Sequence, residues 1–105
     1  MRIEPTARFK REFKRLAKKF PSLKDEVREL VQNLYETPEL GESMGNGCFK
    51  IRLSIAAKGT GKRGGARLIT YVRLINDRID LLSIYDKSEQ SDISDKDISN
   101  ILKDL

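Results

Sequence analysis

The amino-acid sequence predicts an α+β fold, in which a small antiparallel sheet packs against an N-terminal helical hairpin and a short helix follows at the C-terminus. Apolar residues recur every three or four positions through residues 6–36, they alternate with polar residues from 49 to 86, and helical spacing returns after residue 94. Of the 105 residues, 38% are hydrophobic and 35% charged, which suits a single domain over 1–105 with a modest core.

The N-terminal third predicts a short edge strand and two amphipathic helices. The strand is RIEP, residues 2–5. The first helix follows Thr6 as its N-cap and ends at Pro21, with apolar residues on one face and cations on the other. The second helix begins at Ser22, and its apolar stripe spans 23–34. Two helices joined by a Pro–Ser hinge predict a helical hairpin.

The middle of the chain predicts a loop and then a sheet. The segment TPELGESMGNG, 37–47, contains one proline and three glycines, so it predicts a loop. Alternating patterns then predict three strands, at 49–56, 66–75 and 78–86. The last of them is apolar on both faces, which is typical of a central strand. Short connections between the strands predict an antiparallel meander.

The C-terminal segment predicts a short helix. Ser94 is its N-cap with Asp97 three residues later, and Ile93 pairs with Ile98 in a hydrophobic staple. A helix of about three turns must dock onto the sheet or onto a partner to persist.

The net charge of +5 is unevenly distributed along the chain. Residues 43–76 contain no acid but seven cations, whereas acids outnumber bases from Asp77 onward. A cation-rich stretch without acids is the electrostatic signature of a protein that binds a polyanion.

Cysteine and histidine usage excludes several chemistries. Cys48 is the single cysteine, and the chain has no histidine. An internal disulfide, a Cys–His nucleophilic pair and a usual zinc site are therefore excluded, and we expect no cofactor and no metal. The N-terminus lacks the apolar run of a secretory signal, and no stretch approaches the roughly 20 apolar residues of a membrane span. We expect a cytoplasmic protein without membrane association.

The segment KGTGKRGG, 58–65, resembles a phosphate-binding loop, but its surroundings exclude one. Ala56 stands where the first glycine is needed, Arg63 replaces the hydroxyl that binds magnesium, and a strand follows instead of a helix. The segment is predicted to be a flexible basic hairpin loop. We expect Lys58, Lys62 and Arg63 to bind a nucleic acid.

Strand alternation predicts a basic groove beside this loop. Lys50 and Arg52 share one face of their strand, and Arg67 shares a face of the next strand with Tyr71. If the strand register brings these faces together, the result is a basic groove that contains a phenol. Arginine binds phosphate through two parallel hydrogen bonds, and tyrosine can stack on a base or transfer a proton.

Three strings in this order resemble the RelE/ParE superfamily of toxin–antitoxin toxins, and within it the RelE/HigB-like branch. They are CFKIRL (48–53), GKRGGARLITYV (61–72) and IDLLSIYDKSE (79–89), followed by an acidic helix start at ISDKDI. The resemblance covers nearly the whole chain and implies a RelE-like fold. It also implies a ribosome-dependent mRNA endonuclease that cuts codons in the A site and is silenced by a cognate antitoxin.

The resemblance also implies roles for single residues. Lys50 and Arg52 match positions that bind phosphate near the scissile bond, and Arg67 matches an arginine that stabilises the transition state. Tyr85 and Lys87 follow as candidates at the end of the last strand, while Ser88 stands where an arginine is expected. The candidate catalytic residues are thus Lys50, Arg52, Arg67, Tyr71, Tyr85 and Lys87, and the candidate RNA- or ribosome-binding residues are Lys58, Lys62, Arg63, Arg73, Lys10 and Lys14.

Two other functions fit the same sequence. One is a ParE-like gyrase inhibitor, and the other is a basic RNA-binding module without catalysis. The density of cations between 50 and 67 favours RNA over gyrase. For the antitoxin, an acidic and partly disordered segment suits the basic groove. We expect it either to cover the groove or to displace the helix at 94–105.

Overall fold

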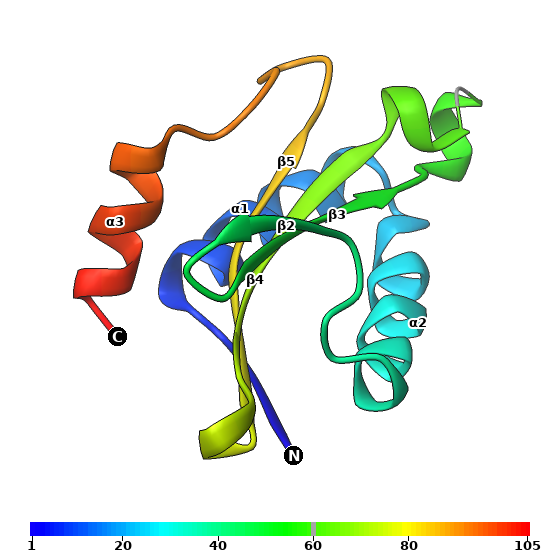
Figure 1. The fold of residues 1–105 in the computed structure, drawn as a ribbon. Helices are drawn as coiled ribbons and strands as arrows, with labels where there is room; N and C mark the ends of the chain where they lie inside the picture. The colour runs from blue at the N-terminus through cyan, green and yellow to red at the C-terminus, as the bar shows by residue number, and fades with distance from the viewer. Residues whose placement is uncertain (60) are drawn as a thin grey trace.

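The computed structural model describes residues 1–59 and 61–105, and Figure 1 shows how their helices and strands are arranged. A five-stranded sheet has the order β1-β5-β4-β3-β2. In chain order the elements are β1 (Arg2–Pro5), α1 (Ala7–Lys19), α2 (Leu23–Glu36), β2 (Glu42–Gly45), β3 (Cys48–Leu53), β4 (Ala66–Arg73), β5 (Arg78–Asp86) and α3 (Asp95–Lys103). The α+β fold class, the N-terminal helical hairpin and the C-terminal helix are confirmed.

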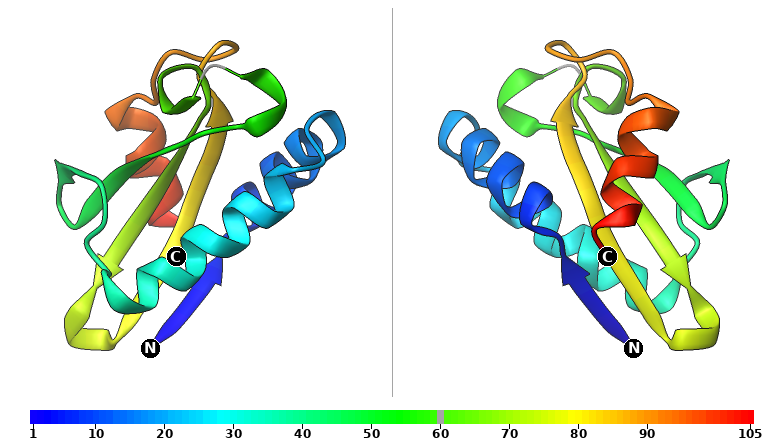
Figure 2. Two further views of the ribbon diagram at one scale, coloured as in Figure 1. Left: turned by 90° about the vertical axis from the view of Figure 1, so that its right-hand side faces the viewer. Right: turned by 90° about the vertical axis from the view of Figure 1, so that its left-hand side faces the viewer.

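The sheet separates two apolar clusters. The larger one lies under α1 and α2 and joins residues such as Leu16 and Leu34 to Leu68 and Ile84 of the sheet. The smaller one lies under α3, where Ile98 packs with residues of β3, β4 and β5. Figure 2 shows the hairpin on one side of the sheet and α3 on the other. The short C-terminal helix therefore docks onto its own sheet.

Two caps predicted for the helices are present. The Thr6 hydroxyl accepts a hydrogen bond from the Phe9 amide at 3.1 Å, and the Ser94 hydroxyl accepts one from the Asp97 amide, also at 3.1 Å. At the start of α2, Ser22 instead donates its hydroxyl to Glu26 at 3.1 Å. None of the helices within 1–59 and 61–105 has the length and apolar character needed to cross a membrane.

The sheet contains more than the predicted meander. The prediction of a loop throughout 37–47 is wrong, because Glu42–Gly45 forms β2 and pairs antiparallel with β3. This strand is short, glycines stand near it at positions 41 and 47, and its register shifts between Ser43 and Gly45, so it lacks the alternation that identifies a strand. At the other edge, the predicted strand 2–5 is present but pairs in parallel with β5, so the sheet is mixed rather than wholly antiparallel.

The connection between β3 and β4 is more ordered than a flexible loop. β3 ends at Leu53, three residues earlier than predicted, and short 3-10 turns follow at 56–58 and 61–64. Thr60, also in the KGTGKRGG segment, lies outside the described residues. A side chain at Gly65 would place its Cβ 2.1 Å from the Leu53 carbonyl oxygen, so only glycine fits where β4 begins.

Candidate functional site

A row of polar side chains crosses the three central strands near the glycine-rich connection. Arg52 of β3 is opposite Arg67 of β4, and Arg67 is opposite Tyr85 of β5. Lys50 lies two residues before Arg52 in β3, so it is on the same face, opposite Ile69. This face is the one that α3 partly covers. The register thus brings Lys50 and Arg52 next to Arg67, as strand alternation predicted.

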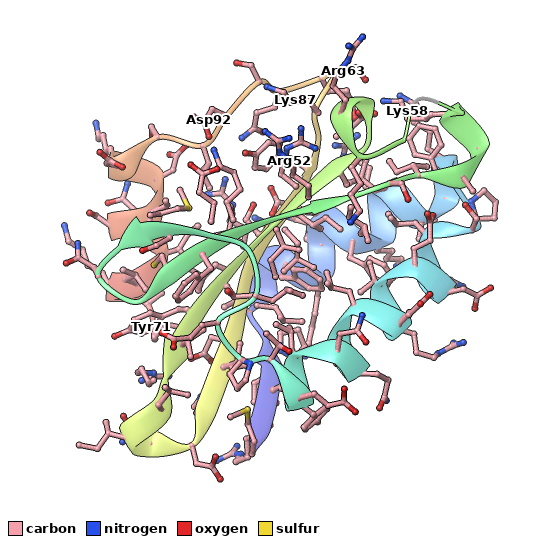
Figure 3. The ribbon with its side chains drawn as sticks, turned by 45° about the vertical axis from the view of Figure 1, so that its right-hand side comes forward. Arg52, Lys58, Arg63, Tyr71, Lys87 and Asp92 are labelled. Carbon is pink, nitrogen blue, oxygen red and sulfur yellow. The ribbon has the colours of Figure 1, made fainter. Side chains whose placement is uncertain are left out.

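A groove of about 680 Å³ runs beside this row and over the edge of the sheet. Its basic side is lined by Lys50, Arg52, Lys62, Arg67 and Lys87. The opposite side is formed by α2, which contributes acidic and amide groups including Glu29 and Asn33. In Figure 3, Arg52, Lys58, Arg63 and Lys87 gather near the same end of the sheet. The groove therefore has room and positive charge for a phosphodiester backbone.

The Arg67 guanidinium supports the turn that carries two predicted RNA contacts. It is 5% exposed, and it donates to the carbonyl oxygens of Lys62 at 2.8 Å, Ala66 at 3.1 Å and Arg63 at 3.2 Å. These carbonyls belong to the 61–64 turn and the start of β4. Arg67 lines the groove, but its hydrogen-bonding groups mainly hold this turn in place.

Lys58 is bonded inside the protein instead of pointing to solvent. Its ammonium lies 2.6 Å from the carboxylate of Asp86 and 2.6 Å from the Ser88 hydroxyl, and it sits over the Phe20 ring at 5.8 Å. Burial alone would raise the pKa of Asp86, but the hydrogen bonds from Lys58 and Ser88 outweigh it and lower that pKa. Ser88, which stands where the resemblance expects an arginine, completes this cluster.

Other cations of the groove are available for a ligand. Arg52, Lys62 and Arg63 are exposed and form no ion pair within the described part of the chain. Lys87 donates to the Ser91 carbonyl oxygen at 2.8 Å, which leaves its ammonium with donors to spare. The free positive charge of the site therefore lies mainly at Arg52, Lys62, Arg63 and Lys87.

Asp92 is a member of the site that sequence reasoning missed. One of its oxygens accepts from the Lys50 ammonium at 3.2 Å and from the Tyr85 hydroxyl at 3.4 Å. The Ile93 amide hydrogen bond, together with Lys50, lowers the pKa of Asp92 below its usual range. The sequence signal was limited to an acid shortly after the last strand, with nothing to indicate that it returns to the sheet.

Tyr85 is buried in the row, with only its hydroxyl near the groove. The side chain is 3% exposed. Burial raises the pKa of Tyr85 to about 12, with contributions from the charge and hydrogen bond of Asp92, and Arg67 opposes this shift. At neutral pH the phenol therefore holds its proton, so it can donate a proton but is a poor acceptor.

The remaining predicted residues lie apart from the groove. Tyr71 pairs with Cys48, four residues along β4 from Arg67, and packs in the cluster under α3. Arg73 stacks on the Tyr71 ring at 4.9 Å and pairs with the buried Asp80. Lys10 and Lys14 are exposed on α1, the helix that covers the other face of the sheet. Figure 3 shows Tyr71 well away from Arg52 and Lys87.

The fold and the groove define a small α+β protein with a basic binding face. Residues 1–104 match a family model described as the RelE toxin of the RelE/RelB toxin–antitoxin system. The chain therefore belongs to the RelE toxin family, which confirms the resemblance to the RelE/ParE superfamily and makes it a toxin of a toxin–antitoxin system. Membership in this family implies an antitoxin partner.

A solved structure has the same fold. It is the E. coli toxin RelE in the free state, with two arginines replaced by alanine. The similarity covers 99% of this chain and 96% of that one, with a TM-score of 0.65 and 16% sequence identity. At this identity the likeness establishes the shared fold, and the chemistry must be argued from the side chains of the present chain.

Proposed function

We propose that this protein is a ribosome-dependent endoribonuclease that acts in the cytoplasm, cleaves mRNA in the A site and thereby inhibits translation. The observation that carries this proposal is the groove lined by Lys50, Arg52, Lys62 and Lys87. The protonated hydroxyl of Tyr85 is linked to Lys50 of this groove through Asp92. Guanidinium and ammonium groups bind phosphate oxygens through charge-assisted hydrogen bonds. A single-stranded RNA backbone is the ligand that this arrangement suits.

The proposed reaction is attack of a ribose 2′-hydroxyl on the adjacent phosphorus. The 2′ oxygen forms a bond to phosphorus and passes its proton to water or to a basic group at the site. The bond from phosphorus to the 5′ oxygen breaks, and that oxygen gains a proton from an acidic group. The products are a 2′,3′-cyclic phosphate and a free 5′-hydroxyl. The chemistry needs charge stabilisation on the phosphorane and proton transfers, and side chains can supply both.

The structure supports a division of these tasks among the groove residues. Lys50 and Arg52 line the groove and would bind the phosphate, and Lys87, just after β5, would add positive charge. Tyr85 suits the proton donor for the leaving 5′ oxygen, because its phenol stays protonated at neutral pH. Positioning of the 2′-hydroxyl in line by the ribosome would contribute further, with roughly 7–11 kcal/mol in the best intramolecular cases. Arg67 acts through the turn that it holds.

We propose that the antitoxin binds the same surface and so inhibits the toxin. An acidic segment would neutralise the exposed cations of the groove, and covering the groove would block the mRNA. A second route is displacement of α3, which packs on the sheet through Ile98 and Ile101. A chain that lacks residues 94–105 but keeps full toxicity and full inhibition by the antitoxin would contradict the second route.

The test is cleavage of mRNA on programmed ribosomes, with 5′ ends mapped by primer extension. We expect cuts in phase with the codon in the A site, no cuts without ribosomes, and loss of cutting in the Lys50→Ala/Arg52→Ala variant. The double variant Lys24→Ala/Lys103→Ala is the matched control, since it removes the same charge from exposed positions of α2 and α3. Intact mRNA in the presence of folded protein would refute the proposal. Inhibition of gyrase in a supercoiling assay would then support the ParE-like alternative.

A further inference from the structure

Asp92 connects two side chains of the groove that come from separate strands. Its Oδ1 atom lies 3.2 Å from the Lys50 ammonium of β3 and 3.4 Å from the Tyr85 hydroxyl of β5. The same oxygen accepts the backbone amide of Ile93 at 2.8 Å, which fixes the carboxylate relative to its own main chain. Three donors from three segments thus converge on a single oxygen.

The two side chains depend on this oxygen for their position. Tyr85 is buried, and within 1–59 and 61–105 its hydroxyl bonds to Asp92 alone. Lys50 has a flexible four-carbon stem, so its ammonium occupies one place only if a partner holds it. Asp92 supplies that partner for both groups.

This contact matters more for geometry than for stability. The Asp92 side chain is 62% exposed, and ion pairs of exposed groups contribute little to folding. At 3.4 Å the bond from Tyr85 is longer than a usual O–H···O bond, so the hydroxyl can turn toward a substrate oxygen. The Lys50 ammonium has three donors and shares one with Asp92, which leaves two for a phosphate.

We propose that Asp92 is a positioning residue, which holds the Lys50 ammonium and the Tyr85 hydroxyl together so that both meet the same phosphodiester. This inference rests on the proposed cleavage of mRNA and adds a residue to it. Lys50 then contacts a phosphate oxygen while Tyr85 faces the leaving oxygen of the same group. Asp92 itself does not touch the reacting atoms.

The contact itself can be tested without any activity. The Asp92 carboxyl is titrated by carbon NMR in the full chain, in the wild type and in the Lys50→Met and Tyr85→Phe variants. Three groups act on this carboxylate: the Ile93 amide, Lys50 of β3 and Tyr85 of β5. We expect the pKa of Asp92 to rise in both variants and to stay unchanged in Lys62→Met. A pKa of Asp92 that is the same in the wild type, Lys50→Met and Tyr85→Phe would overturn the proposal.

The catalytic consequence is tested with Asp92→Asn on programmed ribosomes. The amide oxygen can still accept from Ile93, so the local fold is kept, but the amide lacks the negative charge that holds the Lys50 ammonium. At saturating ribosomes we expect cleavage to slow by about 10- to 100-fold, the effect of one hydrogen bond to a charged group. Ribosome binding and thermal unfolding should match the wild type. Asp92→Glu should restore part of the rate, and Asp95→Asn, the same charge change on α3, should not slow cleavage.

The coupling between the residues gives the decisive outcome. In a Lys50→Met background, Asp92→Asn should cost less than it does in the wild type, because one of the two groups that it positions is already gone. Wild-type cleavage by Asp92→Asn, or fully additive losses, would overturn the positioning role. A wild type that leaves mRNA uncut would refute the proposed function and the catalytic role with it, even if the NMR titration shows the contact.

Discussion

The Lys58 ammonium lies 2.6 Å from the buried carboxylate of Asp86, so the start of the glycine-rich segment is bonded to the end of β5. The other end of the segment is held by Arg67, which donates to carbonyls of the 61–64 turn. The Lys87 amide also donates to the Gly65 carbonyl oxygen at 2.9 Å. Lys58 and Arg67 therefore hold the two described parts of this segment, 58–59 and 61–65, and Lys62 and Arg63 project from the second part.

Replacing Lys58 by methionine should destabilise the protein strongly. Asp86 is 1% exposed, and breaking a buried ion pair from one side costs about 3–5 kcal/mol. Urea unfolding measures this loss, and Lys62→Met, at an exposed cation of the same segment, is the control. A change below about 1 kcal/mol in Lys58→Met would contradict the structural role.

The same pair predicts a loss of stability in acid. The pKa of Asp86 is lower in the folded protein than its ordinary value, so the stabilisation is present above that ordinary value. It is lost as pH falls through the folded pKa. Lys58→Met should therefore lose less stability on acidification than the wild type does.

Replacing Arg67 by lysine separates a support role from a purely catalytic one. A lysine cannot donate to all three carbonyls in the planar geometry of a guanidinium, so buried acceptors are left unpaired at a cost of about 1–3 kcal/mol. We expect lower stability in urea and slower mRNA cleavage, whereas Arg52→Lys at an exposed site should keep its stability. An Arg67→Lys protein that unfolds like the wild type but does not cleave would assign Arg67 to the transition state alone.

The two tyrosines of the sheet should differ in their effect on cleavage. Tyr71 and Arg67 share a face, but four residues at roughly 3.3 Å each separate them by about 13 Å along β4. Tyr85 is opposite Arg67 and reaches Asp92. On programmed ribosomes, Tyr71→Phe should cleave at the wild-type rate, and Tyr85→Phe should be slower by on the order of 100-fold, the contribution of a general acid. A large loss in Tyr71→Phe would move the site toward the other end of β4.

Tyr71 illustrates how far the sequence predicts the site. Alternation of side chains assigns residues to faces, so the grouping of Lys50, Arg52 and Arg67 was predictable and the register confirms it. Alternation does not say how far apart two residues on one face lie along the strand, and this is why it groups Tyr71 with Arg67. The strand pattern was also absent at β2, where glycines and a register shift replace alternation.

The sequence could not predict which side chains form ion pairs or hydrogen bonds with one another. Lys58, Lys62 and Arg63 look alike in a basic loop, yet one of them is bonded to Asp86 and the other two are exposed. The difference depends on where β5 ends relative to the loop, which is a tertiary fact. Asp92 was missed for the same reason, because its segment returns over the sheet only in the folded chain.

The buried phenol of Tyr85 predicts a loss of stability at alkaline pH. Burial, together with Asp92, raises its pKa to about 12, whereas tyrosine in an unfolded chain titrates near about 10. Between these values the unfolded state releases the proton first, so stability is fully present below the unfolded pKa and is lost as pH rises through the folded one.

Urea unfolding from neutral pH to about pH 11 measures this slope. We expect the stability difference between wild type and Tyr85→Phe to shift against the wild type over that interval. Parallel curves for wild type and Tyr85→Phe would show that the phenol titrates equally in both states, which would contradict its burial beside Asp92.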